Sequence, residues 1–459
     1  MRIGCIFLAL IWGRLAFSVE LTAEPVSSSA NAAHREPNSE SAAQVVEVPN
    51  QLSVQQAEEL LIKNNLAVIA TRYGVDAARA QRVVAAYHPN PSMLVAGQQF
   101  DLDFPQRSLV TNSPSAANRT YTLEFDLPIE TGGKRHKRIC SAQSQIDGAE
   151  AQVLDSIRLQ LFLMKSAYFS AVLARENARV ATEVLESVDA TEKLIQRQVA
   201  AGNIAETQLI TLQANRIQFE QALVSAQLSY EQSIRDLLNF LGATPADVIP
   251  APAVPDAAPR ALSAVSLADD LSVPSILPAI EELRTRTELR PDLIAAQRNV
   301  EFAERSLDVA KSGRSPDFTV GTQFARVGHD NTGGMSFIVQ LPLFNRKEGE
   351  IAQAEAQINA AHAQLKQVKL QALTDVEKAW RAYELNTQII KLYDDSAVSK
   401  AKQSLEISEK AFARGGASML DVLDARRTYR QTLVARDQAR FNLRQSILQL
   451  ELATGTRLK

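Results

Sequence analysis

The chain has 459 residues, of which 46% are hydrophobic and only 6% aromatic, and its formal net charge is −3. This balance lacks the basic surplus that binds polyanions, so nucleic acid is not expected as a partner. No stretch after the first 23 residues has 18 apolar residues in a row, which argues against a bundle of transmembrane helices.

The N-terminal segment is typical of an export signal. Arg2 precedes an apolar run over residues 3–17, and small residues follow it. We therefore expect residues 1–23 to be a signal peptide. Residues 24–51, rich in Ser, Ala, Asn and Glu, have the composition of a disordered leader.

The first half of the mature chain predicts helices around a pair of strands. A helix is expected over 52–87, and Pro89 and Pro91 end it. The pattern then predicts strands at 92–104 and 120–128, a long helix at 134–200 and a shorter helix at 206–241. In the strand at 120–128, apolar and polar residues alternate cleanly. The first strand is expected to place Leu94 and Ala96 on its apolar side.

The second half repeats this plan after a Pro- and Ala-rich linker at 242–278. Strands are expected at 316–326 and 334–344, and a long helix at 346–413. Gly97-Gln98-Gln99-Phe100 recurs as Gly321-Thr322-Gln323-Phe324, and Leu127-Pro128-Ile129 recurs as Leu341-Pro342-Leu343. The chain is therefore predicted to be a duplicated unit, with repeats at 52–241 and 279–459.

The strands have the length of tilted strands that cross a bilayer. Their apolar side is expected to face lipid, and comprises Tyr121, Leu123, Phe125, Leu127, Phe318, Val320, Phe324, Phe337, Val339 and Leu341. Their polar side is expected to face a wet lumen, and comprises Gln99, Asp101, Asp103, Glu124, Asp126 and Gln323. Four strands are too few to close a barrel and would leave open edges in hydrocarbon, so several chains must pool their strands.

Two kinds of turn connect these elements. Strand-to-helix corners are expected at Pro128, Gly132, Gly133 and Pro342. Tight helical reversals are expected at Gly202, Asn203, Ile204 and Ala205 and again at Gly415, Gly416, Ala417 and Ser418, because Gly permits the positive φ that such turns need.

The sequence gives no sign of a catalytic, metal or cofactor site. The five His residues are scattered, no Cys pair is present, and no catalytic elbow or phosphate loop appears. We therefore expect a protein that is not an enzyme and that carries no cofactor.

The chain resembles the TolC-type outer membrane efflux proteins over both repeats. Its second half is most similar to the CzcC-type branch of heavy-metal exporters, at Arg290-Pro291-Asp292-Leu293, at Ser315-Pro316-Asp317-Phe318 and at Leu341-Pro342-Leu343-Phe344-Asn345-Arg346. The resemblance implies a mainly α protein with a small β part, a homotrimer whose chains share a twelve-stranded outer membrane barrel, and a long α-helical tunnel through the periplasm. It also implies a periplasmic adaptor (membrane fusion protein) that docks on the helical reversals, and an inner-membrane pump of the RND class.

On this resemblance the cargo is expected to be divalent cations such as cobalt, zinc and cadmium, and the location is the Gram-negative outer membrane. Two alternatives stay open. The same duct could serve multidrug or solute efflux, or type I protein secretion. From another class, the chain could be a structural coiled-coil protein of the periplasm, although such a rod has no use for strands with one apolar and one polar face.

Overall fold

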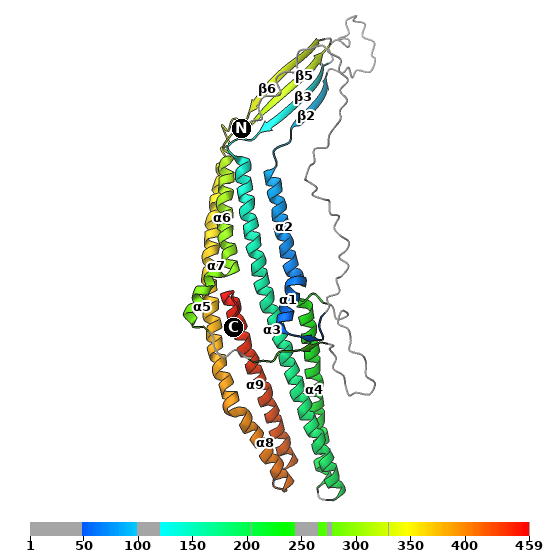
Figure 1. Cartoon of the computed structure of the whole chain (residues 1–459). Coiled ribbons are helices and arrows are strands. Elements are labelled where there is room, and N and C mark those ends of the chain that lie inside the picture. Colours follow the sequence, from blue (N-terminus) through cyan, green and yellow to red (C-terminus); the bar gives the residue numbers. More distant parts are fainter. Residues whose placement is uncertain are drawn as a thin grey trace, which may run out of the picture. The chain divides into compact units, whose positions relative to one another are not determined.

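The computed structural model sets long helices side by side, with a small sheet at one end and helical hairpins at the other (Figure 1). It describes residues 48–98, 120–202, 204–243, 265–272, 278–328 and 330–458, all of which belong to one structural unit, 46–459. The expected signal peptide lies outside the described residues, as does nearly all of the expected leader.

The two halves contain the same kinds of elements in the same order. The first half consists of β1 (Gln51–Leu52), α1 (Val54–Asn64), α2 (Leu66–Ala86), β2 (Ser92–Gln98), β3 (Thr120–Ile129), α3 (Lys134–Ala200) and α4 (Glu206–Phe240). The second consists of β4 (Ser266–Leu267), α5 (Ile280–Arg286), η2 (Thr287–Leu289), α6 (Pro291–Ser312), β5 (Phe318–Val327), β6 (Asp330–Val339), α7 (Glu348–Leu392), η3 (Tyr393–Ala397), α8 (Val398–Ala413) and α9 (Met419–Thr454).

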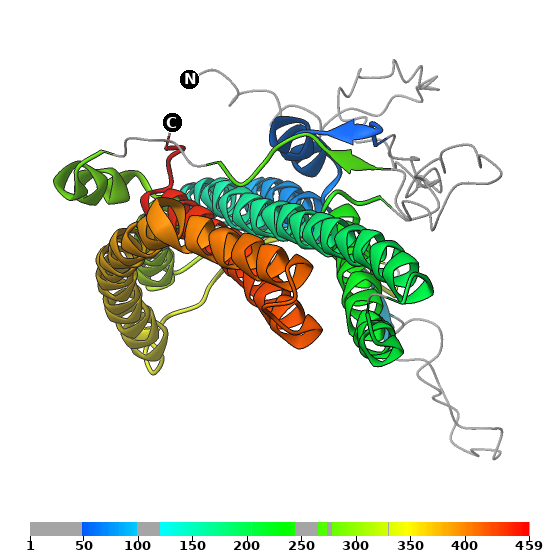
Figure 2. The same ribbon diagram turned by 90° about the horizontal axis from the view of Figure 1, so that it is seen from below.

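Each half pairs one long helical run with two shorter helices that follow one another beside it. α3 packs against α2 over its upper part and against α4 over its lower part. In the second half α6 and α9 lie along α7, and α9 also packs on α8. The view along the helices shows the two lower hairpins, α3 with α4 and α8 with α9, next to each other (Figure 2).

In the first half, the lower helix ends against the start of the upper helix. Gly242 follows the C-cap of α4, and its φ of +70° and its closeness to the Asn64 carbonyl leave no room for a side chain. The Asn65 amide donates to the Phe240 carbonyl over 2.9 Å, while its oxygen accepts from the backbone N–H groups that begin α2. The single helix expected over 52–87 is therefore wrong: Asn65 divides it into α1 and α2.

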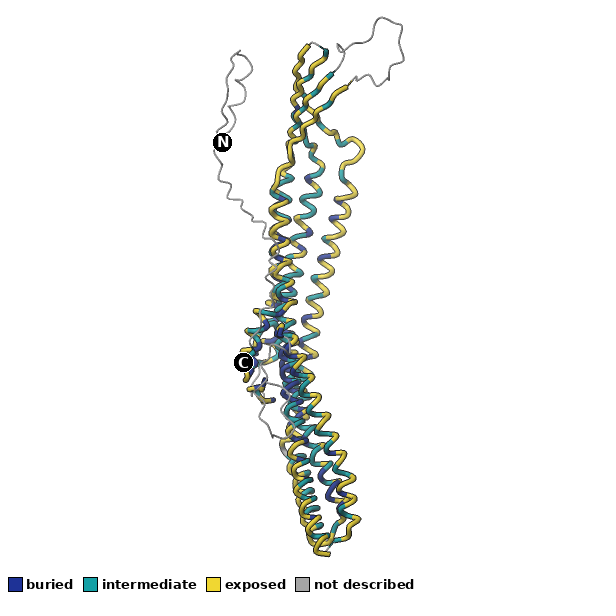
Figure 3. Tube along the Cα trace, turned by 90° about the vertical axis from the view of Figure 1, so that its right-hand side faces the viewer, coloured by how far each residue is buried: buried dark blue, intermediate teal, exposed yellow. Residues whose placement is uncertain are grey.

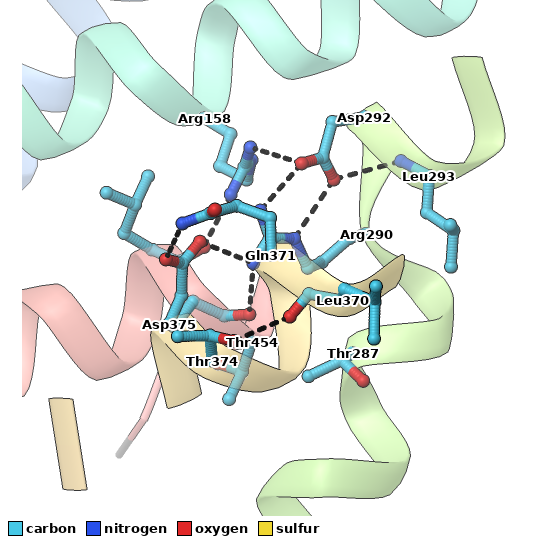
Figure 4. A network of polar contacts seen from close by, with 12 residues as sticks. Arg158, Thr287, Arg290, Asp292, Leu293, Leu370, Gln371, Thr374, Asp375 and Thr454 are labelled. Atoms are coloured by element: carbon cyan, nitrogen blue, oxygen red, sulfur yellow. Dashed lines mark hydrogen bonds and ion pairs between the residues drawn. The ribbon is translucent and has the colours of Figure 1, made fainter. Parts of the chain in front are cut away.

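In the second half, the corresponding junction is held by arginine (Figure 4). Arg290, with its side chain 4% exposed, donates to the Ala453 carbonyl and forms ion pairs with Asp292 at 2.6 Å and Asp375 at 3.3 Å. Arg158 of α3 donates to the Leu452 carbonyl over 2.6 Å. The last carbonyls of α9 have no partners within the helix, so the two guanidinium groups supply the missing donors.

The same network changes the acidity of Asp292. Burial alone would raise the pKa of its carboxyl group, but the hydrogen bonds from Arg290 and the charge of Arg158 outweigh this effect and lower the pKa. The carboxylate is therefore kept ionised inside the junction, where it balances two buried cations.

The main core lies at mid-length of the helices, where buried residues are concentrated (Figure 3). There β1 pairs in parallel with β4, and the Tyr168 hydroxyl lies 2.8 Å from both the Leu52 carbonyl and the Asp269 carboxylate. Part of the segment expected to be a linker, residues 265–272, is thus an ordered component of this core.

The two long helical runs differ. α3 is continuous over the expected range, and among the described residues it is the helix long and apolar enough to cross a membrane. Its apolar side chains Met164, Phe169 and Val172 are buried in the protein core, which accounts for that composition. The second run is helical over nearly the expected range, 348–413, but it contains the π-helical turn η3 between α7 and α8.

The sheet has the order β2-β3-β5-β6, and all neighbouring strands are antiparallel. The fourth strand begins earlier than expected, at Asp330, because Gly328 with φ +61° makes a tight turn after β5. It ends earlier as well, at Val339 rather than near 344, shortly before Pro342, which cannot donate to a ladder.

We predict that Arg290→Met destabilises the fold by about 3 kcal/mol, because it leaves Asp292 and Asp375 without their buried cation. Thermal unfolding followed by circular dichroism in detergent measures the loss. Arg284→Met is the matched control: this arginine is exposed and its pair with Glu377 contributes roughly 0.5 kcal/mol.

The effect should depend on pH. Because the pKa of Asp292 is lowered by folding, its ion pairs stabilise the protein fully above the unfolded pKa of about 3.9 and are lost as the pH falls through the lower folded value. The difference between Arg290→Met and the wild type should therefore shrink below about pH 4. An equal loss of stability in Arg290→Met and Arg284→Met at every pH would contradict the role given to Arg290.

Candidate functional site

The four-stranded sheet has one apolar and one polar face. Residues paired across antiparallel strands share a face, and the register aligns Leu123 with Phe324, Leu127 with Val320, and Val320 with Phe337. One face therefore collects these members of the predicted lipid-facing set: Tyr121, Leu123, Phe125, Leu127, Phe318, Val320, Phe324, Phe337 and Val339. Leu341 follows the end of β6.

The apolar face is open in the single chain. Tyr121, Leu123, Phe125 and Leu127 are each 45–49% exposed, and Phe337 is 65% exposed. An apolar face of this size is not left in contact with water in a soluble protein, so it indicates a surface that lipid or another chain covers.

The opposite face carries Glu124, Asp126 and Gln323. Asp126 leans over Gly321 toward the Ser336 hydroxyl, and a side chain at position 321 would collide with both groups. Among the described residues, the charged members of this face are Glu124, Asp126 and Asp330, all acidic. Three other residues predicted to face a lumen, Gln99, Asp101 and Asp103, lie outside the described residues.

The first strand differs from the expectation. Leu94 pairs with Glu124 and Ala96 with Thr122, so both lie on the polar face, and their expected place on the apolar side is wrong. Met93 and Val95 occupy the apolar face instead, opposite Phe125 and Leu123. The run Met93 to Ala96 is apolar throughout, so alternation could not distinguish its two faces.

The corner after β3 is fixed by side chains from the second repeat. Gly132 has φ +65°, and a Cβ on it would lie 2.5 Å from the Ser315 hydroxyl. Both the backbone conformation and the lack of space therefore require glycine at this position. The Asp317 carboxylate accepts from the Thr131 amide over 2.8 Å and lies 2.7 Å from the Lys134 ammonium. Burial would raise the pKa of Asp317, but these hydrogen bonds outweigh it and lower the pKa.

The other corner glycine and the two prolines also lie where the chain leaves the sheet. Gly133, with φ +68°, precedes α3, and the corresponding place before α7 is taken by Lys347, with φ +63°. Pro128 lies in β3 beyond the last residue that β2 pairs with, and Pro342 follows β6. Pro342 therefore lies outside the ladder, whereas Pro128 has no partner in β2 but is still in register with Thr319 of β5.

The two helical reversals form the far ends of the hairpins (Figure 1). Gly202 has φ +74° and Gly415 has φ +76°, and no atom lies within 4 Å of a Cβ built on either. Glycine is thus favoured by backbone conformation and not by crowding. Ser418 begins α9 with a capping box in which its hydroxyl and Asp421 exchange hydrogen bonds. Ile204, Ala205, Gly416 and Ala417 complete these turns, and Asn203 lies outside the described residues.

A polar contact near these ends joins the two hairpins. Arg426 of α9, with its side chain 4% exposed, lies 2.7 Å from Glu409 of α8 and donates to the Thr191 hydroxyl of α3 over 2.9 Å. Its Nε and Nη1 atoms have no hydrogen-bond partner within the described part of the chain. The sequence did not single out Arg426, because a lone arginine on a charged helix predicts a solvated face.

Three comparisons with known proteins agree with this geometry. A family model described as "Outer membrane efflux protein" matches residues 57–243 and 284–456. The cobalt-zinc-cadmium resistance protein CzcC of Cupriavidus metallidurans is 26% identical over 396 residues, which cover 84% of this chain and 86% of that protein. The pyoverdine export outer membrane protein OpmQ of Pseudomonas putida is also 26% identical, over 83% of this chain and 80% of that protein.

The fold is that of a solved outer membrane protein. The crystal structure of VceC from Vibrio cholerae matches with a TM-score of 0.67 at 20% identity, and the match covers 88% of this chain and 96% of that chain.

We predict that the apolar face of the sheet contacts lipid. Leu123→Asp with Phe125→Asp should abolish stable membrane insertion, since an acidic group at the lipid face costs about 1–3 kcal/mol at each position. Resistance to carbonate extraction measures insertion. Thr120→Asp with Thr122→Asp is the matched control on the polar face of the same strand, and it should insert normally. Normal insertion of the first pair would show that the faces are assigned wrongly.

Proposed function

Because the chain belongs to the outer membrane efflux protein family, we propose that three copies of it close one barrel in the outer membrane and form the exit duct of a tripartite efflux assembly. The protein is a transport channel of the outer membrane and not an enzyme. Family membership also rules out the alternative of a purely structural coiled-coil rod.

The observation that carries the proposal is the sheet, which is both two-faced and open. β2 and β6 are its edges, and each pairs with one neighbour among the described strands. Backbone groups at an open edge cannot be left unpaired in hydrocarbon, so the edge of one copy must pair with the opposite edge of the next. Three copies of four strands give twelve, which exceeds the minimum of about eight for a bacterial barrel.

We propose that the helices continue the duct through the periplasm to an adaptor and an inner-membrane pump of the RND class. α3 has 67 residues and is therefore about 100 Å long. The two turns, at Gly202 and Gly415, lie at the end farthest from the sheet and have open space around them, which suits docking of the adaptor.

The proposed cargo is divalent heavy-metal cations such as cobalt, zinc and cadmium. Similarity to CzcC supports this cargo. So does the polar face of the sheet, where the charged residues within the described strands are acidic and would favour passage of cations. In this proposal the metal is cargo that passes through the duct and not a bound cofactor.

A second cargo class has support of its own. OpmQ, whose name assigns it to pyoverdine export, has the same 26% identity to this chain as CzcC. Efflux of organic solutes through another pump is therefore the alternative for the same duct, with drug efflux or type I protein secretion as further variants.

Deletion of the gene from its native host tests the cargo. We expect the deletion strain to lose tolerance to cobalt, zinc and cadmium, measured as minimal inhibitory concentrations, and to recover it with the wild-type gene. Tolerance to drugs and export of organic solutes should not change. Unchanged metal tolerance together with lost solute export would keep the duct and reject the cations.

Substitutions at the glycines of the two turns test adaptor docking. Gly202→Trp with Gly415→Trp should leave the trimer intact but abolish adaptor binding in a pull-down and abolish export, because two bulky side chains occupy the docking surface. Gly202→Asn with Gly415→Asn is the control at the same positions, because Asn tolerates positive φ and is small. Full adaptor binding by the Trp variant would exclude the turns as the docking site.

A further inference from the structure

Three connections meet at the foot of the sheet, and we call them together the junction belt: residues 130–138, 311–317 and 346–350. Asp317 joins the first two connections through its contacts with Thr131 and Lys134. Lys347 joins the third to them, since its Cγ would lie 3.4 Å from a Cβ on Gly313. The belt is thus one continuous surface and not three separate loops.

The junction belt is strongly basic in a chain that is slightly acidic overall. It contains eight Lys and Arg residues and four Asp and Glu residues, whereas the whole chain has a net charge of −3. Lys134, Arg138 and Lys347 have acidic partners within the belt. Arg314 and Arg346 are exposed, and neither forms an ion pair among the described residues.

The register places this charge directly beside the lower limit of the apolar face. Ile129, Phe318 and Val339 lie in one row across β3, β5 and β6. The belt adjoins Ile129 and Phe318 directly, and after Val339 it begins at Arg346. From Ile129 to Tyr121 the apolar face extends roughly 27 Å along β3, which at a tilt of about 40° spans roughly 20 Å of the apolar band, about 25 Å tall, on bacterial barrels.

The segment after β6 joins the two kinds of surface. Leu341 is 69% exposed, Leu343 is 66% exposed and Phe344 is fully exposed, and Arg346 and Lys347 follow within three residues. Apolar side chains that lack any protein cover and are followed at once by cations are typical of a membrane interface. There the apolar groups enter the acyl region while the cations reach the headgroups.

We propose that the junction belt binds the phosphate headgroups of anionic phospholipids in the periplasmic leaflet, with Arg314 and Arg346 as the main contacts. This proposal rests on the proposed function, which places the foot of the sheet at that leaflet. The two kinds of side chain together indicate which ligand binds. A lipid offers a phosphate to the unpaired arginines and an acyl chain to Leu343 and Phe344, whereas a free anion offers only the charge.

Arg314→Gln with Arg346→Gln tests the belt in the purified full-length trimer. We expect binding to phosphatidylglycerol vesicles to weaken about 30-fold, because each basic residue near an anionic surface contributes about fivefold, while binding to phosphatidylcholine vesicles stays unchanged. Lys366→Gln with Lys369→Gln is the matched control: these two exposed lysines lie further along α7, outside the belt, and should bind as the wild type does.

The outcomes of this experiment distinguish a wrong lipid site from a wrong proposed function. Equal binding of phosphatidylglycerol by the two double variants would overturn the belt as a lipid site. Full displacement of the lipid by millimolar inorganic phosphate would also overturn it, in favour of a free anion site. Resistance to carbonate extraction is measured in parallel. Extraction of the wild-type protein would contradict the proposed function as well. If the Arg314→Gln, Arg346→Gln trimer is inserted and binds phosphatidylglycerol as the wild type does, only the belt is rejected.

Discussion

The architecture depends on two junctions at which one helix ends against the start of another. A helix end leaves carbonyl groups without partners, and a buried end must find donors elsewhere. Asn65 supplies one at the end of α4, and Arg290 and Arg158 supply them at the end of α9. Because these contacts are made across the fold, they fix where each short helix stops along its long neighbour. The sheet and the hairpin turns are thereby held at opposite ends.

The same plan leaves surfaces that the chain cannot cover by itself. We propose that strands of other copies pair with the edges of the sheet, that lipid covers its apolar face, and that the exposed segment after β6 lies at the membrane interface. At mid-length the chain covers its own apolar surface, because β1, β4 and the buried side chains of α3 form a core within one chain. The protein is therefore self-sufficient at its middle and dependent on its surroundings at the membrane end. The family's setting, the outer membrane, supplies what is missing.

Local patterns predicted what depends on local physics. The range of α3, the alternation in β3 and the glycines of both turns follow from periodicity and from positive φ. The bounds of β6 were missed for local reasons, at Gly328 and Pro342, whereas the other misses depend on distant partners. Asn65 caps α2 and also bonds the distant Phe240 carbonyl, and residues 265–272 join the core through β1 and through Tyr168 and Arg175 of α3. The apolar run from Met93 to Ala96 has no period, so pairing with β3 alone decides its faces.

The junctions and the turns use glycine in opposite ways, and the difference bears on how the duct works. Gly242 lies against the Asn64 carbonyl, so its lack of a side chain is needed for packing; Gly202 and Gly415 have open space and are needed for backbone conformation alone. The polar contacts differ likewise. Arg290 is surrounded by acceptors, whereas two nitrogen atoms of the buried Arg426 have none within the described residues. An unsatisfied buried donor costs about 1–3 kcal/mol, so the contact between the hairpins is less stable than its burial suggests. The contact at Arg426 should therefore open more readily than the saturated network around Arg290.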